Sequence, residues 1–342
     1  MIQKLTLKNF RNHEFLEIEF KKPFVYIHGD NGTGKTSILE SIYFCATTKS
    51  HRTNEERELI KRNEQFTQVK IVTDENKYDL VLSKHGKRAS VDGIEKRKIS
   101  DFIGHLRVVM FAPEDLDLIK GSPLNRRQFL DLEWMQLSKG YLKQLNTYKN
   151  VLKQRNSLLK KIGIDDDFTF LDILGDQLFE SGIEMIQQRS AFIDEMNRYL
   201  LEIYPLFSNH QVKIVYKPDV DEKAFRNHLQ KQQKQDIIYQ NTLAGPHRDD
   251  FYIDFNGFDA KSYASQGEQR LIVVALKLAL LKLIENKTNK QVVLLLDDVL
   301  SELDLDKQKL FLNHLPKGHQ ILMNSAQPID GEHIQMIHLK KE

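Results

Sequence analysis

The segment that most restricts how this chain can fold is glycine-rich and spans residues 29–36, which read Gly-Asp-Asn-Gly-Thr-Gly-Lys-Thr. It matches the pattern G-x-x-x-x-G-K-[ST] at every fixed position. The apolar run 24–27 precedes it, and residues 36–46 carry apolar side chains at helical spacing. Between a buried strand and a helix, such a loop surrounds a phosphate with backbone N–H groups and a helix N-terminus. The segment therefore predicts an α/β fold with a phosphate-binding loop.

The residues of this loop have separate expected roles. Lys35 is expected to hold the β- and γ-phosphates of a nucleotide, and the Thr36 hydroxyl is expected to ligate Mg²⁺. A glycine-rich turn with an incidental lysine is the alternative, and the flanking strand and helix make it the weaker one. The predicted phosphate-binding residues are Gly29, Asp30, Asn31, Gly32, Thr33, Gly34, Lys35 and Thr36.

Two adjacent carboxylates follow a second apolar run near the C-terminus. Residues 292–296 have the composition of a strand buried on both faces, and Asp297 and Asp298 come directly after them. A helix N-cap or a turn would also explain the pair. With a phosphate-binding loop in the same chain, we expect Asp297 to bind the metal and Asp298 to polarise the attacking water.

A third motif, Ser-Gln-Gly-Glu-Gln-Arg at 265–270, opens an apolar helix expected over 266–284. A capping box would explain Ser265 and Glu268 but not Gly267, which is unfavourable inside a helix. A small residue there suits a phosphate that approaches the backbone. Ser-Glu-Leu-Asp at 301–304 completes an order of motifs that is more specific than any one of them.

Between the motifs, the chain changes character. The first hundred residues read mostly as strands, with hairpin turns at Gly86 and at Asp92-Gly93. Apolar residues then recur every three or four positions on both sides of a polar turn at 163–167, which predicts an antiparallel helix pair. Whether this pair projects or packs on the core stays open. The expected domains are an N-terminal head segment (1–112), a helical arm (113–206) and a C-terminal head segment (207–342).

Composition restricts the class of protein further. Hydrophobic residues make up 40% and charged residues 29%, as in a globular chain. No apolar run reaches the roughly 18 residues of a membrane span, and the N-terminus lacks a signal-peptide layout. Cys45 is the single cysteine, so an internal disulfide is excluded and a cytoplasmic location is expected. We expect Cys45 to be a small buried hydrophobe.

A net charge of +2 means that affinity for a polyanion must come from local patches. Solvated faces are the alternative explanation for every cluster of basic residues. The candidate clusters are Lys49, His51, Arg52, Arg57, Lys61 and Arg62; then Lys84, Lys87, Arg88, Lys96, Arg97 and Lys98; and, more weakly, Arg126 and Arg127.

Taken together, the order of motifs resembles ATP-binding-cassette (ABC) ATPases of the SMC and Rad50 type and, more narrowly, the bacterial RecF family. Strings that carry the narrower resemblance are Leu-Lys-Asn-Phe-Arg-Asn at 7–12, Ser-His-Arg-Thr at 50–53, Phe-Ala-Pro-Glu-Asp-Leu at 111–116, Lys-Gly-Ser-Pro at 120–123 and Leu-Ala-Gly-Pro-His-Arg-Asp-Asp at 243–250. The resemblance implies an α/β, SMC/Rad50-like P-loop ATPase head with a mixed sheet and an inserted helical arm.

The resemblance also implies roles for residues. Lys35, Asp298 and Ser265 would be catalytic, Thr36 and Asp297 would hold Mg²⁺, and residues 301–304 would form the D-loop. Residues 113–115 lie in the region of the Q-loop but offer no glutamine, so a metal or water contact from Glu114 is a weak expectation. Beyond the loop, the nucleotide-binding residues would be Arg11, Asn12, Ser265, Gly267 and Gln269.

In this family, ATP joins two copies into a homodimer that acts on single-stranded, gapped and junction DNA. The resemblance further implies the partners RecR and RecO and no membrane. Many relatives carry glutamate where this chain has Asp298, and a histidine is expected near 325–326 but absent. Both departures suggest slow hydrolysis and leave the γ-phosphate sensor unassigned.

Other interpretations remain at this stage. The nucleotide-binding subunit of an ABC transporter would share the loop, but it predicts a Leu-Ser-Gly-Gly-Gln signature and the missing histidine. A GTPase is weaker, since 286–289 lacks the last Asp of a guanine-reading motif. His247 suits a structural or a functional role equally, and Asp249 and Asp250 are expected to order loops because they would repel DNA.

Overall fold

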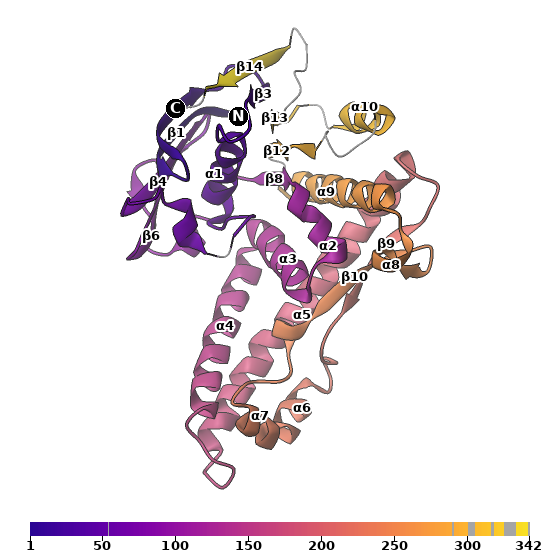
Figure 1. Cartoon of the computed structure of the whole chain (residues 1–342). Coiled ribbons are helices and arrows are strands. Elements are labelled where there is room, and N and C mark those ends of the chain that lie inside the picture. The colour runs from indigo at the N-terminus through magenta and orange to yellow at the C-terminus, as the bar shows by residue number, and fades with distance from the viewer. Residues whose placement is uncertain (54, 289–290, 300–304, 316–317, 325–332, 341–342) are drawn as a thin grey trace. The chain divides into compact units, whose positions relative to one another are not determined.

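The structure, a computed structural model, describes the chain except for residues 54, 289–290, 300–304, 316–317, 325–332 and 341–342 (Figure 1). Its residues form two compact units, 1–116 with 266–342, and 117–265. The second unit extends past the expected arm of 113–206. It does so because residues 207–265 form strands and short helices of their own and pack on the long helix before them.

One sheet of the first unit is antiparallel. Its six strands lie in the order β2-β1-β4-β5-β6-β7. The predicted hairpins at Gly86 and at Asp92-Gly93 are confirmed as the β5–β6 and β6–β7 connections. The strands are β1 (Ile2–Phe10), β2 (His13–Glu19), β4 (Phe66–Thr73), β5 (Lys77–Ser83), β6 (Gly86–Val91) and β7 (Ile94–Glu95).

The other sheet is parallel throughout and places the motifs. Its order is β14-β3-β13-β12-β8, with all four pairings parallel. The glycine-rich loop leaves the carboxyl end of β3, and Asp297 ends β12, so both reach the same edge, where ligands bind in such sheets. The strands are β3 (Phe24–Gly29), β8 (Val108–Phe111), β12 (Val293–Asp297), β13 (Gln320–Asn324) and β14 (Ile334–Leu339).

Helix α1 (Lys35–Thr47) joins the two sheets in one core. It contacts strands of both sheets, and every residue from Ser37 to Thr47 is buried. Cys45 is fully buried within it, as expected. The α/β class is confirmed, with the parallel and antiparallel strands in separate sheets. Short 3₁₀ turns and two further helices complete the unit: η1 (Glu56–Leu59), η2 (Ile99–Asp101), η3 (Pro113–Leu116), α9 (Gln266–Thr288) and α10 (Leu305–His314).

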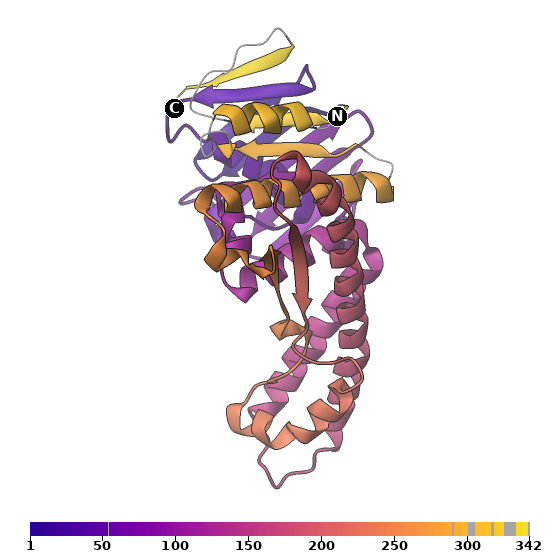
Figure 2. The same ribbon diagram turned by 90° about the vertical axis from the view of Figure 1, so that its right-hand side faces the viewer.

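The second unit is built on the predicted helix pair, α4 (Lys139–Leu159) and α5 (Thr169–Ile203), which run side by side in Figures 1 and 2. Apolar stripe residues such as Leu145 and Leu174 are buried between them, as the spacing predicted. The remaining elements are α2 (Asp117–Lys120), α3 (Pro123–Leu137), η4 (Tyr204–Leu206), β9 (Val212–Lys217), α6 (Phe225–Lys231), α7 (Gln233–Tyr239), η5 (Pro246–Arg248), β10 (Asp250–Phe255), β11 (Phe258–Asp259) and α8 (Ala260–Tyr263).

No helix in the described part of the chain combines the length and the apolar character that crossing a membrane requires.

Candidate nucleotide-binding site

At two glycines of the loop, a side chain of any other residue would clash with neighbouring atoms. Gly29 has φ +151°, and a Cβ there would lie 2.4 Å from the Leu339 carbonyl oxygen. Gly34 has φ +91°, and its Cβ would lie 2.2 Å from His13 Nε2. Both contacts are far inside van der Waals distance, and the positive φ of Gly34 is strained for any other residue. The loop can therefore take this shape only with the glycines that the pattern prescribes.

Lys35 lies over the loop from the first turn of α1. Its Nζ donates hydrogen bonds to the carbonyl oxygens of Gly29 at 2.6 Å and Asp30 at 2.9 Å. The Thr33 hydroxyl also donates to the Asp30 oxygen, at 2.9 Å, which stiffens the turn. The ammonium is thus held at the loop where the pattern expects phosphate, and the helix N-terminus behind it favours an anion.

Thr36 and Asp297 meet across the sheet, 261 positions apart in sequence. The Thr36 hydroxyl donates to Asp297 Oδ1 at 2.9 Å, so two residues expected to hold one metal are adjacent. A hydroxyl and a carboxylate oxygen are hard ligands of the kind Mg²⁺ selects, and Mg²⁺ takes its other ligands from water and phosphates. These residues therefore fit Mg²⁺.

Asn324, at the end of β13, organises both carboxylate positions. Its Nδ2 donates to Asp297 Oδ1 at 2.6 Å, and its Oδ1 accepts from the Asp298 N–H at 2.8 Å. Burial raises the pKa of Asp297, against the hydrogen bonds from Asn324 and Thr36, which lower it. Asp298 has a left-handed φ of +50°. Asn324 was not predicted from the sequence, although an amide at the end of a buried strand was the available signal.

The turn before β2 supports the loop from the other side. Arg11 donates two hydrogen bonds to Glu40 on α1, at 2.9 and 2.7 Å, and Glu40 is fully buried. Asn12 Nδ2 lies 3.5 Å from the Gly32 carbonyl oxygen, and His13 Nε2 donates to the Gly34 oxygen at 3.3 Å. Arg11 thus reaches the helix after the loop, whereas Asn12 contacts the loop itself.

Glu40 was not predicted from the sequence either. Burial would raise the pKa of this carboxyl, but the hydrogen bonds from Arg11 and Ser50 outweigh it and the net shift is downward. The available signal was an acidic residue among the apolar positions of the predicted helix.

Arg52 and Glu114 form an ion pair whose charges act on Asp297. Arg52 Nε is 3.6 Å from Glu114 Oε1. Burial raises the pKa of Glu114, and the charge of Asp297 adds to that shift. Arg52 in turn acts to lower the pKa of Asp297. Arg52, a candidate for DNA from sequence, is therefore close enough to the predicted metal ligand to act on it electrostatically.

The signature motif lies at the start of α9. Ser265 is exposed and immediately precedes the helix, and Gln269 in its first turn is buried. Among the described residues, a Cβ on Gly267 would approach Lys307 Nζ, at 3.4 Å. Residues 301–304 and 325–326, the predicted D-loop and the expected position of the histidine, lie outside the described residues. The catalytic and cross-subunit roles of Ser265 stay predictions.

In the part of the chain that the structure describes, ion pairs separate the basic residues predicted to bind DNA into those that pair with a carboxylate and those that do not. Glu56 pairs with both Lys49 and Lys87, at 2.7 and 2.6 Å, and Glu14 pairs with Lys61 at 3.2 Å. The ring nitrogens of His51 are buried, and burial lowers its pKa to about 4. Exposed cations with no ion pair within the described residues are Arg57, Arg62, Lys84, Arg88, Arg97 and Lys98.

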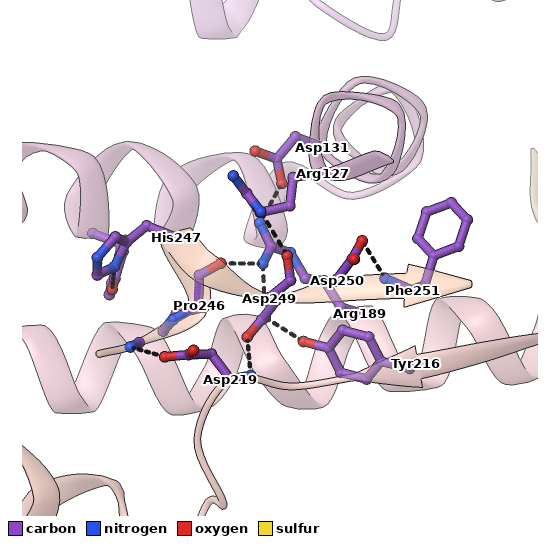
Figure 3. Close-up of polar contacts among 12 residues, drawn as sticks. Arg127, Asp131, Arg189, Tyr216, Asp219, Pro246, His247, Asp249, Asp250 and Phe251 are labelled. Atoms are coloured by element: carbon purple, nitrogen blue, oxygen red, sulfur yellow. Dashed lines mark hydrogen bonds and ion pairs between the residues drawn. The ribbon is translucent and has the colours of Figure 1, made fainter. Parts of the chain in front are cut away.

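The weak prediction that Arg126 binds DNA was wrong, because its side chain is a buried partner of Asp250. The two form paired hydrogen bonds at 2.6 and 3.0 Å, and the Arg126 side chain is only 10% exposed. Arg127 is half-buried and donates to the Asp249 carbonyl oxygen at 2.8 Å (Figure 3). Neither guanidinium is presented as an open phosphate contact.

His247 has a structural role. Its Nε2 donates to the Thr242 oxygen at 3.0 Å, so its Nδ1 accepts from the Tyr148 hydroxyl at 2.7 Å. Burial lowers its pKa, which keeps this tautomer neutral. Asp249 is fully buried and orders the segment around it, as expected.

A phosphate loop after β3, the adjacent Thr36 and Asp297 side chains that fit Mg²⁺, and a helix that begins at the predicted signature motif define a P-loop ATPase head of the ABC type. The sequence matches the RecF/RecN/SMC N terminal domain family over residues 1–329. An Smc head bound to the C-winged helix domain of ScpA aligns with a TM-score of 0.50 and 17% identity, over 95% of this chain and 90% of that one, which shows a likeness of fold alone.

The similarity to RecF proteins is much closer. The DNA replication and repair protein RecF of Acholeplasma laidlawii (strain PG-8A) is 52% identical over 331 residues, which cover 97% of this chain and 95% of that protein. A solved structure of the recombination mediator protein RecF-ATP in the RecFOR pathway aligns with a TM-score of 0.90 and 31% identity, over 97% of this chain and 93% of that one. The chain belongs to the RecF family, which confirms the resemblance seen in the sequence and favours it over the transporter alternative.

Proposed function

We propose that this chain is an ATP-dependent DNA-binding protein of recombinational repair and replication restart. It binds ATP and Mg²⁺ at the glycine-rich loop, dimerises on ATP, and acts at gapped or single-strand/double-strand junction DNA to help load recombinase. The observation that carries the proposal is the Thr36–Asp297 hydrogen bond at the mouth of a complete P-loop. The RecF-ATP structure, which resembles this chain over almost its whole length, supports it.

The chemistry is slow ATP hydrolysis that depends on DNA. Lys35 and the loop N–H groups hold the phosphates, and Thr36 and Asp297 hold Mg²⁺, which when bound neutralises phosphate charge. Asp298 orients a water and takes its proton as the water oxygen attacks the γ-phosphorus and the bond to the β–γ bridging oxygen breaks. The products are ADP and phosphate. An aspartate is one methylene shorter than a glutamate, which suits a switch with low turnover.

The homodimer follows from the signature motif. Ser265 and Gly267 contact ATP held by a second copy, so ATP binding joins two heads and hydrolysis separates them. Gln269 is buried in the first turn of α9, so it is not presented to a second copy. The family's pathway supports RecR and RecO as partners and a cytoplasmic location.

Replacing Asp298 with asparagine is expected to trap the ATP-bound dimer. The amide still orients water but accepts no proton, so hydrolysis falls by at least about 100-fold. Size-exclusion chromatography with ATP should show a stable dimer for Asp298→Asn, a mixture for wild type and monomer without nucleotide. A variant that binds ATP yet elutes only as monomer would contradict the sandwich.

DNA affinity is expected to rise with ATP and to fall steeply with salt. Each phosphate contact adds about one to the slope of log affinity against log salt. We assign such contacts to the exposed hairpin cations Arg88 and Arg97, so Arg88→Ala/Arg97→Ala should lower the slope by about two. The control is Lys21→Ala/Lys70→Ala, which also removes two positive charges but from lysines that pair with Glu19 and Asp79. Fluorescence anisotropy on gapped and blunt duplexes measures both. Equal affinity for the two duplexes, with and without ATP, would contradict the function.

A further inference from the structure

Helix α9 carries a buried lysine in its middle. Lys277 is 4% exposed, and its Nζ lies 2.8 Å from Asp115 Oδ1, a side chain that is 15% exposed. Removing an ammonium from water is costly unless a partner compensates it. This ion pair therefore fixes where α9 meets the 3₁₀ turn η3.

Asp115 makes a second contact that shapes its own turn. Its Oδ2 accepts a hydrogen bond from the Ala112 N–H at 2.8 Å, just after β8 ends at Phe111. One carboxylate thus closes the turn with one oxygen and binds α9 with the other. Because β8 pairs with β12, this turn sits on the strand next to the one that ends in Asp297.

The residue that this turn presents is Glu114. As described above, it lies 3.6 Å from Arg52 and senses the charge of Asp297. Its position relative to the predicted metal site is set by the backbone of 112–115, and that backbone is held by Asp115. Lys277 therefore influences the position of Glu114 through Asp115.

The same helix begins with the signature motif. Lys277 is eleven residues after Gln266, about 16 Å along a helix. A continuous helix of this length is stiff, so a displacement at its first turn reaches Lys277. Engagement of the signature by a second copy and the placement of Glu114 are thus mechanically linked within one head.

We propose that Lys277 is a positioning residue that, through Asp115, holds Glu114 beside Asp297 and couples dimer contact at the signature to ATP hydrolysis. This inference rests on the proposed function. Lys277 takes no chemical step in this proposal, and it acts through its ion pair with Asp115. A purely structural ion pair would contribute to stability without linking hydrolysis to dimer contact.

The test compares Lys277→Met, Lys277→Arg and the control Lys282→Met, an exposed lysine of the same helix. For Lys277→Met we expect ATP affinity within about twofold of wild type and a kcat lower by about tenfold, which is about 1.4 kcal/mol in barrier. In wild type, turnover per protomer should rise with protein concentration as dimers form, and in Lys277→Met this rise should be absent. Lys277→Arg, which keeps the charge, should restore both, and Lys282→Met should match wild type.

Because Lys277→Met leaves a buried carboxylate uncompensated, Lys277→Met/Asp115→Asn provides a second variant that removes both charges and keeps an acceptor for the Ala112 N–H. It should fold and show the same loss of coupling. A lower Tm with unchanged kcat and unchanged concentration dependence would overturn the positioning role. A variant at Lys277 that loses ATP binding as well as turnover would also overturn the positioning role. Failure of wild type to hydrolyse ATP would instead overturn the proposed function, and this inference with it.

Discussion

Lys35→Met is expected to weaken ATP binding by at least about 100-fold, which corresponds to about 2.7 kcal/mol. Charge-assisted hydrogen bonds contribute about 1.5–3 kcal/mol each, and we propose that the ammonium binds the β- and γ-phosphates. In the structure its Nζ already lies within 3 Å of the Gly29 and Asp30 carbonyl oxygens, at 2.6 and 2.9 Å. Methionine keeps the length of the side chain and removes the charge. Isothermal titration with ATP measures the loss.

The control for this experiment is Lys21→Met, which removes an exposed lysine of the same unit, 75% exposed at its side chain. It should bind ATP as wild type does. Lys35→Met should also fail to dimerise on ATP, because dimer formation needs the bound nucleotide. Wild-type affinity in Lys35→Met would refute the assignment of the loop, whatever its effect on DNA binding.

Short-range features of the fold were readable from the sequence. The P-loop, the helices α1 and α9 and the pair α4–α5 each depend on residues close together in the chain, so periodicity and turn chemistry found them. The order of the parallel sheet was not readable, since β3 lies between β13 and β14, which come almost 300 residues later. Parallel pairing leaves no local signal, because the connections are long.

The same limit explains which site residues were found. Lys35, Thr36 and Asp297 belong to motifs with fixed local spacing. Asn324 and Glu40 act through partners that only the fold brings close, 27 and 29 positions away. A polar residue in an apolar segment indicates that it has a buried partner, but the sequence does not show which residue that partner is. Arg126 was a weak candidate for DNA binding for this reason, since nothing local indicates its partner Asp250.

A buried charge network holds the second unit together, with Arg189 at its centre (Figure 3). Arg189 donates to Asp131 and Asp249, both at 2.8 Å, and to the Pro246 carbonyl oxygen at 2.6 Å. It is 3% exposed at its side chain. The network thereby joins α3 and α5 to the segment before β10. Arg189 thus pairs with two carboxylates, the fully buried Asp249 and the largely buried Asp131, which also pairs with Lys149 at 3.5 Å.

Arg189→Met is therefore expected to destabilise the second unit by about 3–5 kcal/mol, the cost of leaving a buried charge without its partner. Arg226→Met is the matched control: its ion pair with Asp176 is exposed, and such pairs contribute about 0–1 kcal/mol. Urea unfolding followed by circular dichroism measures both. Equal losses in the two variants would show that the network does not hold the unit together.

The pH dependence of Arg189→Met separates lost charge from lost packing. Burial acts to raise the pKa of Asp131, but Arg189 and Lys149 outweigh it, so the net shift is downward. Ionised Asp131 thus stabilises wild type above its unfolded pKa of about 3.9, and this is lost as pH falls through the lower folded value. Without Arg189 the pKa rises, and protonation then relieves the uncompensated charge. The gap in unfolding free energy between variant and wild type should narrow from pH 7 to pH 4, whereas lost packing alone would keep it constant.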